Sequence, residues 1–339
     1  MSFDPNAAAP EQSGVFGLPH TPEEARVVLV PVPFEATTSY GGGTSGGPQA
    51  ILEASKQVDL WDLEVGKPYE AGIAMLEESI DLRAWDLAAR AAASHVIARG
   101  GTHNDPQLLA AAETVNAHLE KMNAWVRATV QLLLRRGKLV GTIGGDHSIS
   151  FGAIEAHLQQ YPELGLLHFD AHADLRRAYE GFEWSHASIM ENVIRKTALP
   201  KLVSVGIRDL CEEEYERIQS SDGRIVAFYD AALADARFAG ETWAQQCARI
   251  VAPLPKEVYI SFDIDGLDPA LCPHTGTKVP GGLSFQMATS LIGAVARSGR
   301  RIVGFDLTEV APAQDGSEWD ENVGARLLYK LIGWMLKTA

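Results

Sequence analysis

Eight short apolar runs, separated by longer segments with helical spacing, most constrain how this chain can fold. Each run is continuous rather than alternating and rich in Val, Ile and Leu, which is typical of strands buried on both faces of a parallel sheet. The runs are 26–34, 71–76, 138–145, 164–170, 201–207, 224–230, 257–265 and 301–310. Helical patterns such as 86–99, 106–136 and 324–337 lie between them. The alternation predicts an α/β fold with a doubly wound sheet of about eight strands.

The chain shows no internal repeat and no linker that would divide it. We therefore expect a single domain over residues 26–339, preceded by an irregular N-terminal extension over residues 1–25. The glycine-rich segment 40–51 could cradle a phosphate, but it lacks the motifs of the known nucleotide-binding loops. A flexible loop at the rim of a site is the favoured interpretation.

Charge and cysteine content narrow the class of partner. The net charge of −15 and the lack of a basic stripe argue against a nucleic-acid partner. No apolar run reaches the ~18 residues that a membrane span needs, and the N-terminus does not resemble a secretion signal. The three cysteines show no C-x-x-C spacing, which is typical of a reduced protein. We expect a cytoplasmic protein with no membrane partner.

Polar side chains follow four of the apolar runs, at the point where each run ends. The clusters are Gly144-Gly145-Asp146-His147, Asp170-Ala171-His172-Ala173-Asp174, Asp263-Ile264-Asp265 and Asp306-Leu307-Thr308-Glu309. Because ligands bind outside the carboxyl ends of parallel strands, all four clusters can meet in one crevice. In the second cluster, Asp170, His172 and Asp174 alternate along an extended segment and therefore point to the same side.

Carboxylates held together in a partly buried place repel each other unless a cation lies between them or one is protonated. Each uncompensated buried charge would cost on the order of several kcal/mol. One histidine or one D-x-D pair alone would more often be a loop or a cap, but jointly the clusters predict metal binding. Oxygen-rich ligation with imidazole suits two divalent ions, with Mn²⁺ preferred and Ni²⁺, Co²⁺ or Fe²⁺ possible. Shared carboxylates could hold such ions about 3.5 Å apart, where they lower the pKa of a bridging water.

Four motifs in the chain resemble the ureohydrolase family, which includes arginase and agmatinase. They are GGDHS (144–148), DAHAD (170–174), SFDIDGLDP (261–269) and GFDLTEVAP (304–312). The resemblance extends from residue 26 to the C-terminus. It implies the arginase-like fold, a three-layer α/β/α domain with a mostly parallel eight-stranded sheet, and by analogy a homo-oligomer, either a trimer or a hexamer.

The resemblance also implies two sets of metal ligands that share Asp170 and Asp263 as bridging carboxylates. One ion would be held by His147, Asp170, Asp174 and Asp263, and the other by His172, Asp170, Asp263 and Asp265. Three residues would take part in the reaction. Asp174 would accept a hydrogen bond from the bridging hydroxide, Glu309 would bind the guanidinium group, and His186 would shuttle protons to the leaving amine.

The implied reaction is hydrolysis of a guanidino group with release of urea. The stretch LRRAYEGFEWSH (175–186) departs from arginase and resembles agmatinases, so agmatine is the expected substrate. Trp184 and Phe182 could close a small pocket there. The stretch DGLDPALCPHTGTKVPGG (265–282) departs from the commoner agmatinase pattern and places Cys272 and His274 near the expected mouth of the site, where His274 could contact the substrate.

Several alternatives remain at this point. The substrate could be free guanidine, because the segment 102–125 and SEWDENVGARLLYKL (317–331) resemble a divergent branch of the family that includes hydrolases of free guanidine. Guanidinobutyrate and arginine are further alternatives. A catalytically silent homologue acting as an assembly partner would be expected to lack a ligand, and none is missing. Amide hydrolysis, as in the deacetylases that share this architecture, would use one zinc ion rather than a full bimetal set.

Overall fold

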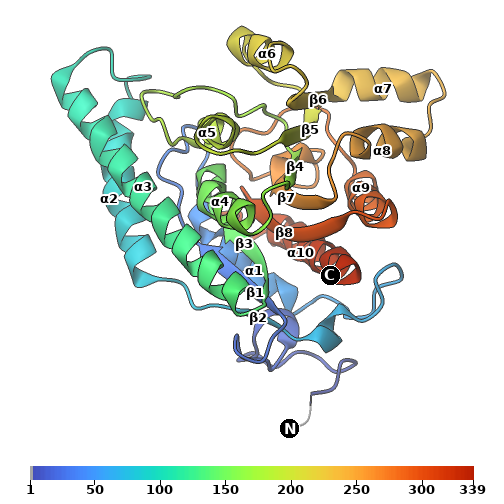
Figure 1. Ribbon diagram of the computed structural model, residues 1–339. Helices are drawn as coiled ribbons and strands as arrows, with labels where there is room; N and C mark the ends of the chain where they lie inside the picture. Colours follow the sequence, from blue (N-terminus) through green and yellow to red (C-terminus); the bar gives the residue numbers. More distant parts are fainter. Residues whose placement is uncertain (1–2) are drawn as a thin grey trace.

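The centre of the computed structural model, which describes residues 3–339, is an eight-stranded sheet whose neighbouring strands all run parallel (Figure 1). The strands lie in the order β2-β1-β3-β8-β7-β4-β5-β6. Their bounds are β1 Val27–Val32, β2 Ile73–Met75, β3 Leu139–Gly144, β4 Gly165–Phe169, β5 Lys201–Ile207, β6 Ile225–Tyr229, β7 Glu257–Asp263 and β8 Arg301–Thr308. Each predicted apolar run contains one of these strands, so the predicted sheet is confirmed.

Both faces of the sheet are buried, which explains why the strands are continuously apolar. Successive side chains of a strand point to opposite faces. In β1, Val27 and Leu29 join one core, whereas Val28 and Val30 join the other. β-branched residues suit this position because they pack well on a pleated surface.

Helices cover the two faces and complete the three-layer α/β/α arrangement that we expected (Figure 1). One layer consists of α2 Ile80–Ile97, α3 Pro106–Arg135, α4 Ser150–Gln160 and α5 Ile189–Lys196, and α6 Glu212–Gln219 adds Ile218 to the same core. The other consists of α1 Gly47–Ser55, α7 Asp230–Phe238, α8 Trp243–Val251, α9 Phe285–Arg297 and α10 Trp319–Thr338. Within the described residues, no helix is both long and apolar enough to cross a membrane.

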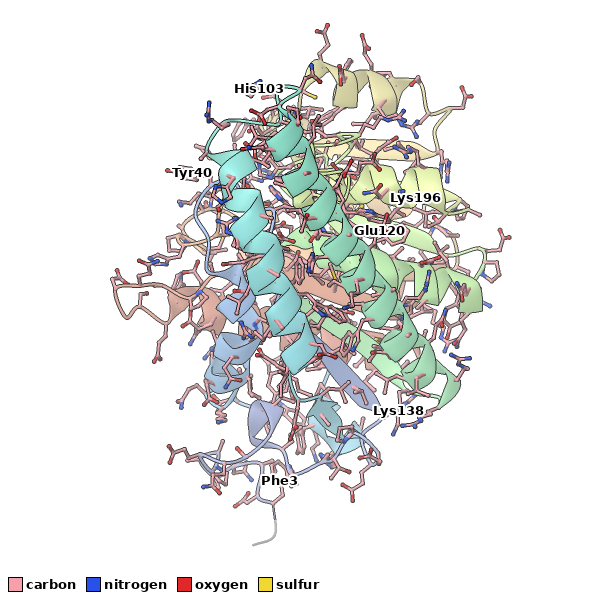
Figure 2. The ribbon with its side chains drawn as sticks, turned by 90° about the vertical axis from the view of Figure 1, so that its left-hand side faces the viewer. Phe3, Tyr40, His103, Glu120, Lys138 and Lys196 are labelled. Atoms are coloured by element: carbon pink, nitrogen blue, oxygen red, sulfur yellow. The ribbon has the colours of Figure 1, made fainter. Side chains whose placement is uncertain are left out.

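The segment 102–125 consists of a short loop and the first part of α3, the longest helix of the chain. The helix begins after Asp105, whose carboxylate accepts hydrogen bonds from the backbone N–H groups of Gln107 and Leu108 at 2.8 and 3.3 Å. Pro106 at the first helical position has no N–H to leave unpaired there. The helices α2 and α3 lie side by side across one face of the molecule (Figure 2).

Part of the segment 3–25, expected to be an irregular extension, packs against the helices of its own chain. The backbone N–H of Phe16 donates to Ser55 Oγ in α1 at 2.8 Å, and its ring lies 4.9 Å from the ring of Tyr329 in α10. Val15 and Leu18 are buried in the same core. The extension is therefore anchored over α1 and α10.

Candidate metal centre

Four neighbouring strands bring the predicted clusters together. The strands β3, β8, β7 and β4 lie next to one another in the middle of the sheet. His147 follows β3, Glu309 follows β8, Asp263 ends β7, and Asp170 follows β4. Because the strands are parallel, all four side chains lie at the same edge of the sheet, as expected for a ligand crevice in this fold class.

His147 lies in the midst of three carboxylates. Its Nδ1 is 3.1 Å from Asp170 Oδ2, 3.0 Å from Asp174 Oδ2 and 3.5 Å from Asp263 Oδ2. All four side chains are buried. One nitrogen and three carboxylate oxygens converging in this way could hold a divalent cation, and they are the four residues of the first ligand set expected from the sequence.

A second group of donors surrounds His172. Its Nδ1 is 3.0 Å from Asp265 Oδ2 and 3.4 Å from Asp170 Oδ1. Asp170 therefore directs one oxygen toward His147 and the other toward His172, as a bridging carboxylate would. Backbone N–H groups fix these acids: Ala171 donates to Asp265 at 3.0 Å, and Asp265 donates to Asp263 at 2.8 Å.

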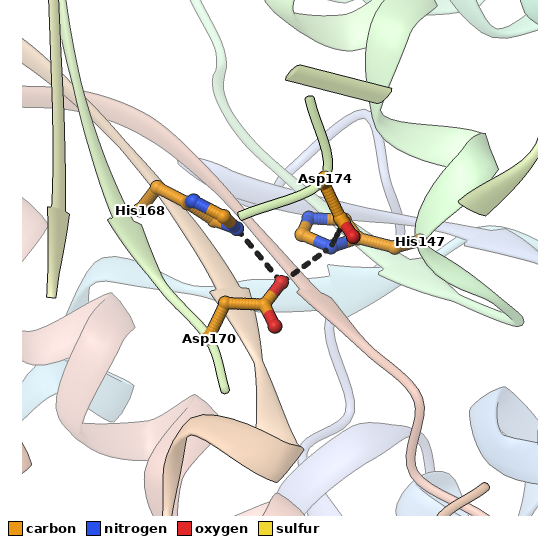
Figure 3. Close-up of side chains that lie close together, drawn as sticks. All are labelled: His147, His168, Asp170 and Asp174. Carbon is orange, nitrogen blue, oxygen red and sulfur yellow. Dashed lines mark hydrogen bonds and ion pairs between the residues drawn. The ribbon is translucent and has the colours of Figure 1, made fainter. Parts of the chain in front are cut away.

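His168 joins the first group, although the sequence did not lead us to it. Its Nε2 lies 2.8 Å from Asp170 Oδ2, and Figure 3 shows His168 and His147 on either side of the Asp170 carboxylate. The donor atoms of His147, His168, Asp170 and Asp174 all lie within 4.8 Å of one another. The alternation that placed Asp170 and Asp174 on one side also includes His168, two positions earlier, and could have revealed it.

The electrostatics of the cluster show that it needs positive charge. Burial, followed by the neighbouring Asp265 and Asp170 charges, raises the pKa of Asp263 well above its ordinary value. Burial alone would lower the pKa of His147, but the carboxylates of Asp170 and Asp174 raise it well above the ordinary value. Without a cation the cluster would hold protons instead, so the donor set fits divalent ions.

The far side of His147 is also fixed. Its Nε2 lies 2.9 Å from Ser261 Oγ, and the Ser261 hydroxyl donates to Asp306 Oδ1 at 2.8 Å. With the Ser261 proton given to Asp306, Nε2–H donates to Ser261, so the neutral ring that a bound ion requires would offer the lone pair of Nδ1 to that ion. Asp306, which belonged to one of the predicted clusters, therefore lies behind the metal site rather than in the crevice.

Two of the acids adopt backbone conformations that are uncommon for residues other than glycine. The φ angles of Asp174 and Glu309 are 55° and 63°. Such outliers persist only where the surrounding structure holds them, and they concentrate at functional sites. Here both conformations aim a carboxylate into the crevice.

The crevice opens into a cavity of about 410 Å³. Six of the predicted residues line it: His147, His172, Asp174, Asp263, His186 and Glu309. The rim includes Ser39 and, from the glycine-rich loop, Tyr40. Glu35 holds this loop by accepting hydrogen bonds from the backbone N–H groups of Gly43 and Ser45 at 2.7 and 3.0 Å. The loop thus forms one wall of the cavity.

Glu309 and His186 lie on the walls, close to the donor cluster. Glu309 Oε1 accepts a hydrogen bond from the backbone N–H of His147 at 2.8 Å, and burial raises its pKa well above the ordinary value. Burial, and then the charges of His172 and His147, lower the pKa of His186 to about 4. Metal ions nearby would add positive charge and favour the neutral imidazole further.

The structure does not bring the other proposed substrate contacts into the cavity lining. Trp184 is buried against Phe151, and its Nε1 donates to Glu120 of α3 at 3.0 Å. His274 Nδ1 instead lies 2.8 Å from Asp320 Oδ2 at the start of α10. Two further residues from these stretches are fully buried in the cores: Phe182 and Cys272.

Comparison with known proteins agrees with this geometry. The sequence profile of the arginase family matches residues 25–333. An N(1)-aminopropylagmatine ureohydrolase of Thermus thermophilus is 36% identical over 321 residues, 94% of each chain. An agmatinase of Bacillus subtilis is 30% identical, covering 91% of this chain and 92% of its own. The crystal structure of the agmatine ureohydrolase of Thermoplasma volcanium superposes with a TM-score of 0.71 at 26% identity, covering 94% of this chain and 92% of that one.

The chain belongs to the arginase family, whose members depend on a binuclear metal centre. It is a hydrolase of C–N bonds in linear amidines, and its relatives are agmatinase-like ureohydrolases that release urea from a guanidino group. The predicted family and enzyme class are therefore confirmed.

Proposed function

We propose that this chain hydrolyses agmatine, or a close guanidino alkylamine, to urea and the free amine, with two Mn²⁺ ions as cofactor. The observation that carries this proposal is the position of Asp170, with one oxygen toward His147 and the other toward His172. Two bound divalent ions would supply hydroxide at neutral pH by lowering the pKa of a water. The proposed ligands are the two sets that share Asp170 and Asp263, completed by His147 and Asp174 on one side and by His172 and Asp265 on the other.

The remaining roles follow from charge and position. The Glu309 carboxylate would bind the guanidinium group through charge-assisted hydrogen bonds, which orient the central carbon for attack. Asp174 would accept a hydrogen bond from the attacking water. Neutral His186 would take up a proton at the cavity and give it to the leaving amine.

Asp209 supports a substrate with a cationic tail. This exposed acid lines the cavity, and its backbone N–H donates a hydrogen bond to Ala171 O at 3.0 Å, close to the donor cluster. Glu214, the other acid on this wall, already has Arg176 at 3.7 Å and accepts a hydrogen bond from Leu175 N–H. Asp209 is thus the carboxylate available to the amine of agmatine.

A urea-release panel tests the proposal. The Mn²⁺-loaded and Ni²⁺-loaded proteins would be assayed with agmatine, N(1)-aminopropylagmatine, arginine, guanidinobutyrate, guanidinopropionate and guanidine. We expect the highest kcat/KM for one of the two guanidino alkylamines, with Mn²⁺ as the better cofactor. Urea from none of the six compounds would overturn the proposal.

The Asp209→Asn variant tests the proposed tail contact. We expect it to raise KM for agmatine about 10-fold, which corresponds to the loss of one charge-assisted contact of about 1.4 kcal/mol. Any hydrolysis of guanidine, which has no amine tail, should be unchanged. An unchanged KM for agmatine would show that another group binds the amine.

We further propose a cytoplasmic homo-oligomer, a trimer or a hexamer, which light scattering of the purified protein would test.

A further inference from the structure

A buried hydroxyl lies where three segments meet beside the cavity. Thr37 follows β1, Asp146 follows β3, and His186 begins the short helix His186–Ser188. Thr37 and Asp146 are fully buried, and the side chain of Thr37 lies between the other two. None of the predicted site roles involves Thr37.

The contacts of this hydroxyl are close. Thr37 Oγ1 is 3.1 Å from Asp146 Oδ2 and 3.1 Å from His186 Nδ1. It also accepts a hydrogen bond from the backbone N–H of His186 at 3.2 Å. The next nearest group to Nδ1 is Ser185 Oγ at 3.4 Å, and that oxygen accepts a hydrogen bond from Ala187 N–H.

A hydroxyl has one proton to give and two lone pairs to offer, so the direction of each bond can be assigned. Asp146 is surrounded by donors: Ser148 donates from both its backbone N–H and its hydroxyl, and the Thr37 backbone N–H points at Oδ2 from 3.4 Å. Asp146 therefore acts as an acceptor, and the Thr37 hydroxyl gives its proton to it. The Thr37 oxygen is left to accept from His186, from the backbone N–H and from Nδ1–H.

This assignment fixes the tautomer of the imidazole. With its proton on Nδ1, neutral His186 carries its lone pair on Nε2, the nitrogen left for the cavity that His186 lines. We propose that Thr37, backed by Asp146, is a positioning residue that holds His186 with Nε2 free to accept a proton at the reacting groups. This inference rests on the proposed role of His186 as the proton carrier.

The chain offers a matched control for the test. Thr38 is the adjacent residue, it is also buried, and its hydroxyl has no hydrogen-bond partner among the described residues. We expect Thr37→Val to lower kcat about 10- to 100-fold with little change in KM, a part of the roughly 100- to 10,000-fold that proton transfer by a positioned side chain contributes. Thr38→Val should keep kcat within about 2-fold of the parent, because it removes no hydrogen bond. Thr37→Ser should restore most of kcat, since it keeps the hydroxyl.

A double-mutant comparison separates positioning from a general structural effect. In a His186→Ala background, adding Thr37→Val should lower kcat no further. The single variant Thr37→Val should still bind two Mn²⁺ ions per chain, as measured by elemental analysis. Independent losses in the double variant, or loss of metal from Thr37→Val, would overturn the inference. If Thr37→Val does not fold, Thr37→Ala serves in the same comparison. Low activity of Thr37→Ser would also overturn the inference. If His186→Ala alone leaves kcat unchanged, the proposed role of His186 fails instead.

Discussion

At the scale of single residues, the donor cluster works because each imidazole has a defined orientation. His147 presents Nδ1 to the carboxylates because Ser261 occupies its Nε2, and Asp306 in turn orients Ser261. His168 is oriented in a similar way, with Nδ1 3.1 Å from Ser204 Oγ and Nε2 toward Asp170. Partners of this kind raise metal affinity without touching the ion.

Removal of the hydroxyl behind His147 should therefore weaken metal binding. We expect Ser261→Ala to reduce the affinity for one of the two ions about 10- to 100-fold, because His147 loses the acceptor that fixes its tautomer. Calorimetric titration of the metal-free protein with Mn²⁺ measures the affinity for each ion. Thr289→Val in α9, which removes a buried hydroxyl bonded only to backbone carbonyls, is the control. Affinities in Ser261→Ala that equal those of the wild-type protein for both ions would contradict the role given to Ser261.

At the scale of elements, the sequence was most informative for the strands and least for what lies beside them. Continuous apolar runs mark strands buried on both faces, so all eight were found within a few residues of their ends. The strand order could not be obtained in this way, because it depends on how helices cover the faces. Thr37 and Ser261 escaped notice for a similar reason: a hydroxyl gains its role only from partners that the fold brings to it.

The packing of α4 against the sheet buries a histidine, His157. His157 is fully buried, with Nδ1 2.8 Å from Ala153 O and its ring edge against Tyr259. Burial lowers its pKa from the ordinary 6.5 to about 4. Between these values the unfolded chain binds a proton that the folded chain does not, so folding should lose stability as the pH falls from 6.5 to 4, by about 3 kcal/mol.

Denaturant unfolding of the wild-type protein and of His157→Leu at pH 7 and pH 4.5 tests this. The variant should show a smaller loss of unfolding free energy on acidification than the wild type. His118→Leu in α3 replaces a partly exposed histidine whose Nδ1 makes the same contact with the carbonyl four residues earlier, and it should behave like the wild type. An identical pH dependence in His157→Leu and the wild type would be evidence against a neutral buried imidazole.

At the scale of the whole molecule, the metal centre joins the middle of the sheet. The candidate donors follow β3, β4 and β7, so bound ions would link segments as far apart in the sequence as His147 and Asp263. Metal that binds only the folded chain stabilises it by mass action, by about 4 kcal/mol at a thousandfold excess over Kd. Because the ligands must lose protons to bind, this stabilisation depends on pH.

The direction of that dependence follows from the groups involved. In the metal-free chain, burial raises the pKa of Asp263, and the carboxylates raise the pKa of His147, so both hold protons that the ions must displace. The gain in Tm on adding Mn²⁺ should therefore be larger at pH 8 than at pH 6. Thermal unfolding with and without chelator at both pH values measures it. A gain that is equal or smaller at pH 8 would show that metal binding releases no protons from these groups.

The most direct test of the central claim is a metal titration of urea release. Metal-free protein would receive Mn²⁺ in steps, and urea formed from agmatine would be measured against ions bound per chain. The binuclear centre predicts that urea release rises until two ions are bound and then stays constant, and that Asp265→Asn neither binds the second ion tightly nor releases urea. Full activity with a single bound ion, or in Asp265→Asn, would contradict it.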